Sequence, residues 1–257
     1  MDLGLKERVV IVTGASSGIG AAVAAAYGRE GARVALTYRV NRSGAERAAR
    51  EVEAAGGQAI SLQLDLGEPG GADGLAGAVM ERWGRLDVLV ASAVQWPDRS
   101  PGGRFEALPH PAWKEGLRVN VEGTFALVQA VLARMRPSGW GRILFMSTGL
   151  AEEGMRGAET YTAGKAALHG LARTLAWDVG RDGILINVLA AGFTLTDRNR
   201  AAIPSEVQDA VAARVPLGRL STPEDIVSPV LYLTSAANTS ITGEVIREGT
   251  STGRSSH

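Results

Sequence analysis

The sequence of 257 residues contains no cysteine. Disulfide bonds, thiolate catalysis and cysteine-ligated zinc are therefore excluded. Histidine is also scarce, and the three that occur share no metal-ligand spacing: His110, His169 and His257. We therefore expect no metal site, and we expect each histidine to be structural or solvated.

An excess of charge of one sign is missing as well, since 27 Lys and Arg residues balance 27 Asp and Glu residues. This balance gives no indication of nucleic acid or of an anionic membrane as a partner. No apolar run approaches the ~18 residues of a membrane-spanning helix, and no basic N-terminal region with an apolar core is present. We therefore expect a cytoplasmic protein without a membrane partner.

Short apolar segments alternate with helical segments along the chain, which is typical of a parallel sheet covered by helices on both faces. The expected strands are Val9–Val12, Arg33–Tyr38, Ala59–Leu64, Val88–Ser92, Ile143–Ser147, Ile184–Leu189 and Glu244–Ile246. The expected helices are Ala21–Glu30, Ser43–Ala55, Gly71–Trp83, Ala112–Met135, Thr160–Val179 and Pro223–Thr234. We predict an α/β fold with a single domain over residues 1–257, a doubly wound (Rossmann) parallel sheet of about seven strands. Residues 250–257 are expected to form a flexible tail or a subunit contact.

A glycine-rich turn separates the first expected strand from the first expected helix. In such a strand–turn–helix unit, Gly14 allows a sharp turn, Gly18 allows close approach of a pyrophosphate, and Gly20 allows the helix to pack on the strand. The N-terminus of the helix adds unpaired N–H groups and the positive end of a dipole. The sequence therefore predicts a dinucleotide-binding turn formed by Gly14, Ser16, Ser17, Gly18, Ile19 and Gly20.

Tyr161 and Lys165 are four residues apart in a helical segment, so their side chains share one face. An unperturbed phenol has a pKa near ~10, and a neighbouring cation lowers that pKa toward neutral pH. The same spacing also occurs in weak surface pairs on solvated helices. Ligands of doubly wound sheets bind where the strands end, and the helix that carries Tyr161 can return to that edge. We therefore expect the tyrosine and the glycine turn to share one cleft.

The combined motifs resemble the short-chain dehydrogenase/reductase family. The matching elements are Thr13-Gly14-x-x-x-Gly18-x-Gly20, Asp65-Leu66, Leu86-Asp87-Val88-Leu89-Val90, Asn120-Val121-x-Gly123, Ser147-Thr148, Tyr161-x-x-x-Lys165 and Pro216-Leu217-Gly218-Arg219. They extend from residue 5 to about residue 249, in the order and spacing of the family. The pattern is most similar to the 3-oxoacyl-acyl carrier protein reductases, which are tetrameric NADPH-dependent ketoreductases.

The resemblance implies a catalytic role for several side chains. Tyr161 would give its proton to the carbonyl oxygen, and Lys165 would lower the pKa of the tyrosine and bind the nicotinamide ribose. Asn120 would hold a water that links Lys165 to solvent. A hydroxyl would orient the carbonyl, and the family spacing places it at Thr148, where the family has serine. Ser147 is the alternative if the loop that follows shifts its register.

The chain also departs from the family in three other places. Ala91-Ser92-Ala93-Val94 replaces the usual Asn-Asn-Ala-Gly, Ala191-Gly192 replaces Pro-Gly, and Arg247-Glu248-Gly249-Thr250 replaces Val-Asp-Gly-Gly. These changes indicate a branch with an altered pocket, or a branch that has lost activity. The intact Asn120, Tyr161 and Lys165 favour the first interpretation.

The end of the second strand bears on the choice between NAD and NADP, because an acidic residue there would bind the ribose 2′-OH of NAD. Here Tyr38 is followed by Arg39, whose planar fork of donors suits a 2′-phosphate, although a solvated arginine is the alternative. We therefore predict NADP(H). The resemblance further assigns cofactor contacts to Ala91, Asp65, Leu66, Thr194 and Thr196.

The substrate is less closely defined. The expected substrate contacts are Trp96 and Phe193, unless these side chains simply pack in their loops. Trp96 lies in the loop 95–111, and Phe193 begins a segment that forms a mobile lid in the family. Arg134, Arg136 and Arg181 form either a basic patch for an acyl carrier protein or a solvated helix end.

The leading hypothesis is an NADPH-dependent ketoreductase of secondary metabolism, assembled as a homotetramer. It would reduce a β-ketoacyl or polyketide-like carbonyl, either free or carried on an acyl carrier protein. The alternatives are an NADP-dependent alcohol or sugar dehydrogenase and a non-catalytic protein that senses the nucleotide.

Overall fold

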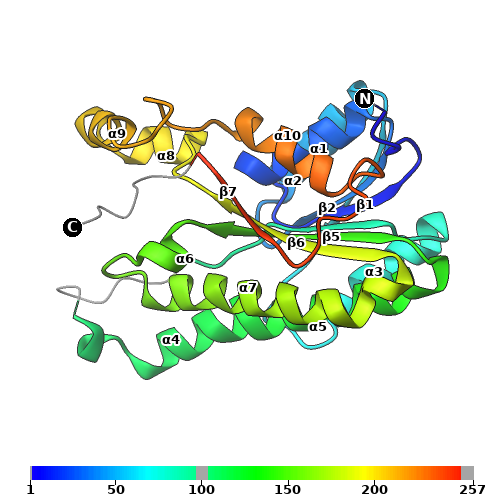
Figure 1. The fold of residues 1–257 in the computed structure, drawn as a ribbon, viewed down its shortest axis with the longest axis horizontal. Helices are drawn as coiled ribbons and strands as arrows, with labels where there is room; N and C mark the ends of the chain where they lie inside the picture. The colour runs from blue at the N-terminus through cyan, green and yellow to red at the C-terminus, as the bar shows by residue number, and fades with distance from the viewer. Residues whose placement is uncertain (1, 97–103, 250–257) are drawn as a thin grey trace.

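A parallel sheet of seven strands runs through the computed structural model, which describes residues 2–96 and 104–249 (Figure 1). The strands are β1 (Val9–Val12), β2 (Arg33–Tyr38), β3 (Gln58–Gln63), β4 (Val88–Ala91), β5 (Gly141–Thr148), β6 (Ile184–Ala191) and β7 (Val245–Glu248). Their order is β3-β2-β1-β4-β5-β6-β7, and each neighbouring pair is parallel. The order reverses direction between β1 and β4, which confirms the predicted doubly wound sheet. The expectation for residues 250–257 lies outside the described residues.

Helices cover both faces of the sheet (Figure 1). One face carries α1 (Gly18–Arg29), α2 (Arg42–Ala54) and α10 (Pro223–Leu233), and the other carries α3 (Gly71–Trp83), α5 (Gly123–Met135) and α7 (Glu159–Val179). Four shorter helices are α4 (His110–Leu117), α6 (Leu150–Glu153), α8 (Asp197–Ala202) and α9 (Ser205–Ala212). None of the helices in the described ranges has both the length and the apolarity needed to span a membrane.

Two apolar cores lie on opposite faces of the sheet. Side chains alternate along a strand, so in β1 Val9 and Ile11 pack with the core under α3, α5 and α7, whereas Val10 and Val12 pack with the core under α1 and α10. A strand buried on both faces reads as an unbroken apolar run, which is why β1 is recognisable from sequence.

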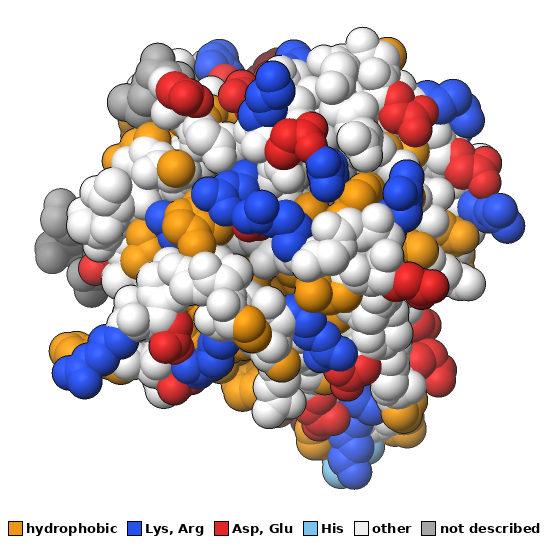
Figure 2. Space-filling model, turned by 90° about the vertical axis from the view of Figure 1, so that its right-hand side faces the viewer, with side chains coloured by type: hydrophobic (Ala, Val, Ile, Leu, Met, Phe, Trp, Pro, Cys, Tyr) orange, Lys and Arg blue, Asp and Glu red, His pale blue; other side chains and the backbone are white. Residues whose placement is uncertain are grey.

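On the outer surface, Lys and Arg side chains are interspersed with Asp and Glu on the face shown in Figure 2.

The segment predicted as one helix over Ala112–Met135 differs from that prediction. The helical path begins at His110, and α4 and α5 are separated by a π-helical turn at Arg118–Glu122. Such turns insert a residue into a helix and occur often at functional sites. This one carries Asn120. The short helices α6, α8 and α9 were not predicted, because they offer at most about two turns of apolar periodicity.

A buried carboxylate fixes the start of β4, at the edge of the sheet opposite to the ends of the strands. Asp87 accepts hydrogen bonds from the backbone N–H of Val9 at 2.9 Å and from Arg8 at 2.9 Å. Arg85 donates to both of its oxygens, at 2.8 and 2.6 Å. The carboxylate thereby ties β4 to the start of β1.

Candidate active site

The glycine turn after β1 has the backbone geometry that the sequence predicts. Gly14 and Gly18 have φ angles of +67° and +56°, in the left-handed region that favours glycine. A Cβ atom added to Gly20 would lie 2.5 Å from the carbonyl oxygen of Gly14, so only glycine lets α1 pack on the turn. A Cβ added to Gly14 would lie 2.9 Å from the Cα of Ala93. The backbone therefore approaches the neighbouring loop closely at this point.

Threonine hydroxyls hold this turn to the ends of the adjacent strands. The Oγ1 of Thr13 accepts hydrogen bonds from the backbone N–H groups of Ser92 and Ala93, both at 3.0 Å. The N–H of Gly14 donates to the Oγ1 of Thr37 at 3.2 Å. The ends of β1, β2 and β4 are thus bound together, although this chain has no asparagine directly after β4.

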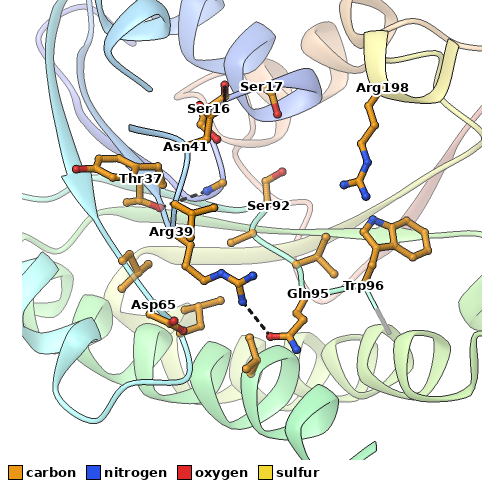
Figure 3. Close-up of a pocket in the computed structure, with 18 residues that line it drawn as sticks. Ser16, Ser17, Thr37, Arg39, Asn41, Asp65, Ser92, Gln95, Trp96 and Arg198 are labelled. Atoms are coloured by element: carbon orange, nitrogen blue, oxygen red, sulfur yellow. Dashed lines mark hydrogen bonds between the residues drawn. The ribbon is translucent and has the colours of Figure 1, made fainter. Parts of the chain in front are cut away.

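A cleft of about 330 Å³ opens at the carboxyl ends of these strands (Figure 3). It brings together many of the predicted cofactor and substrate residues: Gly14, Ser16, Ser17, Tyr38, Arg39, Asp65, Leu66 and Trp96. The predicted Gly18, Ile19 and Gly20 continue from its wall into α1. The cleft therefore lies where the sequence places a nucleotide.

The cleft is also lined by polar residues that the sequence interpretation did not assign to the site, among them Asn41 and Arg198. The Oδ1 of Asn41 accepts from the backbone N–H of Gly44 at 3.0 Å and caps α2, while its Nδ2 donates to the carbonyl of Ser16 at 3.4 Å. An asparagine before a helix is a capping signal that could have identified it. Arg198 extends from α8 toward the cleft, and no sequence signal marks it (Figure 3).

The remaining predicted cofactor and substrate residues do not line the cleft. Thr196 caps α8 by accepting from the N–H of Asn199 at 3.3 Å, and its methyl carbon is 3.1 Å from a Cβ built on Gly18. It therefore faces the glycine turn. Thr194 and Ala91 are buried, and Phe193 is half-buried.

The predicted reacting side chains meet where β5 and α7 lie side by side. Tyr161, which is 8% exposed, lies near enough to the buried Thr148 for the two hydroxyl groups to interact. Burial raises the pKa of the Tyr161 phenol, and the interaction with Thr148 offsets part of that rise. The expected lowering of this pKa below its ordinary value is therefore wrong for this structure.

The direction of the Lys165 side chain explains why the pKa of Tyr161 is not lowered. Its buried Nζ donates to the carbonyl oxygen of Met146 at 2.7 Å, so the ammonium is directed at β5. Burial lowers the pKa of Lys165 to about 8. Desolvation thus dominates the titration of both side chains.

Ser147 has a different partner from Thr148. Its Oγ lies 2.8 Å from the Nε2 of His169, and both residues are buried. Burial lowers the pKa of His169, and the nearby positive charges of Arg173 and Lys165 lower it further, so the imidazole is neutral at neutral pH. The geometry favours Thr148 over Ser147 as the hydroxyl that faces a substrate beside Tyr161.

If Thr148 positions a substrate carbonyl, as the resemblance to the family implies, Thr148→Ala should lower kcat/KM for ketone reduction by about 10- to 100-fold. Thr148→Ser should keep most of the activity, since it keeps the hydroxyl. Ser147→Ala is the matched control and should change kcat/KM by less than about 3-fold, while its lost hydrogen bond lowers stability. Steady-state kinetics of the three variants test this assignment. An active Thr148→Ala together with an inactive Ser147→Ala would reverse it.

Asn120 joins the π-helical turn to the loop after β4. Its Oδ1 accepts from the backbone N–H of Gln95 at 2.8 Å, and its Nδ2 donates to the carbonyl of Gln95 at 2.8 Å. The side chain of Gln95 in turn accepts from Arg39 at 3.2 Å. Asn120 therefore fixes the backbone of this loop, and its predicted role in holding a water stays a prediction.

The residues of the cleft fit a dinucleotide. Gly14 lines the cleft, and α1 directs its N-terminus at the cleft wall. Hydroxyl, amide and guanidinium groups supply donors for phosphates: Ser16, Ser17, Asn41 and Arg39. Asp65 offers a carboxylate for an amino group. Donors for phosphate and an acceptor for a base thus occur together.

Comparison with known proteins agrees with this geometry. A family model described as Enoyl-(Acyl carrier protein) reductase matches residues 14–247. L-rhamnose 1-dehydrogenase (NAD(P)(+)) from Sphingomonas sp. is 33% identical in sequence, and the match covers 94% of each chain. D-threitol dehydrogenase from Mycolicibacterium smegmatis is also 33% identical, and the match covers 94% of this chain and 91% of that protein. A 3-oxoacyl (acyl-carrier-protein) reductase from Agrobacterium tumefaciens C58, solved with NADP bound, superposes with a TM-score of 0.87 at 33% identity, over 95% of this chain and 94% of that one. The chain thus belongs to the short-chain dehydrogenase/reductase family of oxidoreductases, as its motifs predict.

Proposed function

We propose that this protein is an NADPH-dependent ketoreductase that reduces a β-ketoacyl or polyketide-like carbonyl to an alcohol. The observation that carries the proposal is the buried, neighbouring pair of Tyr161 and Thr148 near a cleft suited to a dinucleotide. A phenol and a hydroxyl side by side can both approach one carbonyl oxygen. That is the arrangement needed to orient and protonate it.

The roles of the side chains follow from their environment. NADPH, when bound, supplies the hydride that the carbonyl carbon receives. Thr148 donates a hydrogen bond to the carbonyl oxygen, and Tyr161, kept protonated by burial, transfers its phenolic proton to that oxygen as it gains negative charge. Lys165, with a pKa of about 8, carries a transferable proton near neutral pH from which the phenol can be restored. Ser16, Ser17 and Arg39 would hold the cofactor phosphates.

The choice of NADP(H) rests on Arg39, at the rim of the cleft. We expect Arg39→Asp to weaken NADPH binding relative to NADH binding by about 10- to 100-fold, because a charge-assisted contact to the 2′-phosphate is replaced by repulsion. Fluorescence titration with both nucleotides measures the change. Arg42→Gln is the matched control, since Arg42 is exposed and paired with Glu46 at 2.8 Å. An unchanged preference in Arg39→Asp would refute the assignment.

A second candidate is an NADP-dependent alcohol or sugar dehydrogenase that works in the oxidative direction. The names of two relatives, an L-rhamnose and a D-threitol dehydrogenase, favour it. Assays of NADPH oxidation with β-ketoacyl thioesters and aryl ketones, beside NADP⁺ reduction with aldoses and polyols, separate the two. Nucleotide binding without turnover in either direction would instead support the non-catalytic alternative.

The delivery of substrate by an acyl carrier protein has weaker support. Arg134 pairs with Asp73 at 3.0 Å, and Arg136 pairs with Asp178 at 2.6 Å, so acidic side chains already neutralise much of the predicted basic patch. We therefore favour a free substrate. Equal kcat/KM for one β-ketoacyl group on a short thioester and on a carrier protein would agree with this choice. The homotetramer remains a prediction that light scattering can test.

A further inference from the structure

An aromatic side chain covers the proposed proton donor. The indole ring of Trp96 stacks on the ring of Tyr161, with 4.3 Å between ring centroids and 19° between their planes. Trp96 lines the cleft and is 49% exposed, whereas Tyr161 does not line it and is 8% exposed. The indole therefore stands between the open cleft and one face of the phenol.

The backbone that precedes Trp96 is held in place. The buried side chain of Asn120 bonds both the N–H and the carbonyl of Gln95, each at 2.8 Å, as described above. Arg39 holds the side chain of the same glutamine at 3.2 Å. Trp96 thus follows a residue with three hydrogen bonds, so its stack on Tyr161 is part of a built arrangement.

The exposed part of the indole presents an apolar, flat surface to the cleft. Val94, at the position where the family has glycine, lines the same wall. Figure 3 shows Trp96 below Arg198, with the indole inside the cleft. A carbonyl group that reaches the hydroxyl of Tyr161 must therefore bring its substituent next to the indole.

Flat and puckered ring substituents on the ketone differ in the binding free energy that they gain at such a surface. An aromatic ring can stack on the indole, or take its place on Tyr161, and so preserves the favourable geometry of an aromatic pair. A saturated ring of the same size gains only area burial and cannot replace the stack. The difference corresponds to a factor of about 2 to 10 in binding.

We propose that Trp96 is a specificity-determining residue that selects ketones carrying an aromatic ring on the carbonyl carbon. This inference rests on the proposed ketoreductase function and narrows its substrate class to aryl ketones. The stack on Tyr161 and the fixed position of Gln95 carry it.

A matched pair of substrates tests the inference. Acetophenone and cyclohexyl methyl ketone have the same carbon skeleton and differ in the flatness of the ring. The wild-type protein should reduce acetophenone with a kcat/KM about 2 to 10 times higher. Trp96→Leu should bring this ratio near one, and Trp96→Phe should keep part of the preference. Inhibition of the wild-type protein by 1-phenylethanol and 1-cyclohexylethanol should show the same order and needs no variant.

Trp177→Leu is the control, because Trp177 is 90% exposed and lies on α7 about 24 Å along the helix from Tyr161. Trp177→Leu should leave the ratio of kcat/KM for the two ketones unchanged, provided that the variant has the same oligomeric state as the wild-type protein. A wild-type enzyme that reduces ketones without preferring acetophenone, or a Trp96→Leu variant with an unchanged ratio, would overturn the inference and leave the proposed function intact. Failure to reduce any ketone with NADPH would overturn the proposed function itself.

Discussion

Replacing Tyr161 with phenylalanine is expected to lower kcat by about 10²- to 10⁴-fold, the contribution typical of a positioned general acid. The aromatic ring and its stack with Trp96 remain, so only the phenolic hydroxyl and its interaction with Thr148 are lost. The dissociation constant of NADPH should stay within about 2-fold, since Tyr161 does not line the cleft that fits the dinucleotide. Stopped-flow kinetics and fluorescence titration measure the two quantities.

Tyr232→Phe is the matched control for this substitution. Tyr232 lies on α10, on the opposite face of the sheet from α7, and is partly exposed. Its loss of a hydroxyl should leave kcat unchanged. Wild-type turnover by the Tyr161→Phe protein would show that another group donates the proton, and the mechanism proposed above would have to be abandoned.

Asp87→Asn is expected to destabilise the fold by about 3 kcal/mol, because it leaves two arginines beside a neutral group that was a buried carboxylate. For a chain of this size the loss corresponds to a fall in Tm of roughly 6 to 12 °C. The site should be spared, since Asp87 lies at the start of β4 and the cleft lies at its end. Urea denaturation followed by circular dichroism gives the free energy of unfolding.

Asp73→Asn provides the comparison for a surface pair. Asp73 bonds Arg134 at 3.0 Å, but its side chain is 72% exposed, so its loss should cost less than about 1 kcal/mol. Similar losses of stability in the two variants would mean that the carboxylate of Asp87 is no more important than a solvated one.

The fold could be predicted from sequence because its signals are local. Apolar runs such as Val9–Val12 mark strands buried on both faces, and Gly14 and Gly18 of the first turn mark backbone in the left-handed region that favours glycine. The α7 helix, with 21 residues, was long enough for its periodicity to be plain. The π-helical turn was not predictable, because one inserted residue scarcely changes an apolar pattern.

The site was predictable in its residues and less so in its contacts. The identity and spacing of Tyr161, Lys165 and Thr148 indicated a reacting group, but the direction of a lysine side chain depends on tertiary neighbours. The carbonyl of Met146 takes up the ammonium, and burial then decides the pKa of Tyr161. The stack of Trp96 on that tyrosine joins two segments far apart in the chain, and no local pattern encodes such a contact.

The strand order has a consequence for how this protein can evolve. Arg39 follows β2 and Thr148 ends β5, and these strands are three steps apart in the sheet, or roughly 14 Å. Substitutions at that separation generally have additive free energies when they share no partner. Arg39, however, bonds Gln95, whose neighbour Trp96 stacks on Tyr161. Mutations that exchange one nucleotide for the other can therefore reach the proposed acid through Gln95, and the two halves of the sheet are not free to diverge independently.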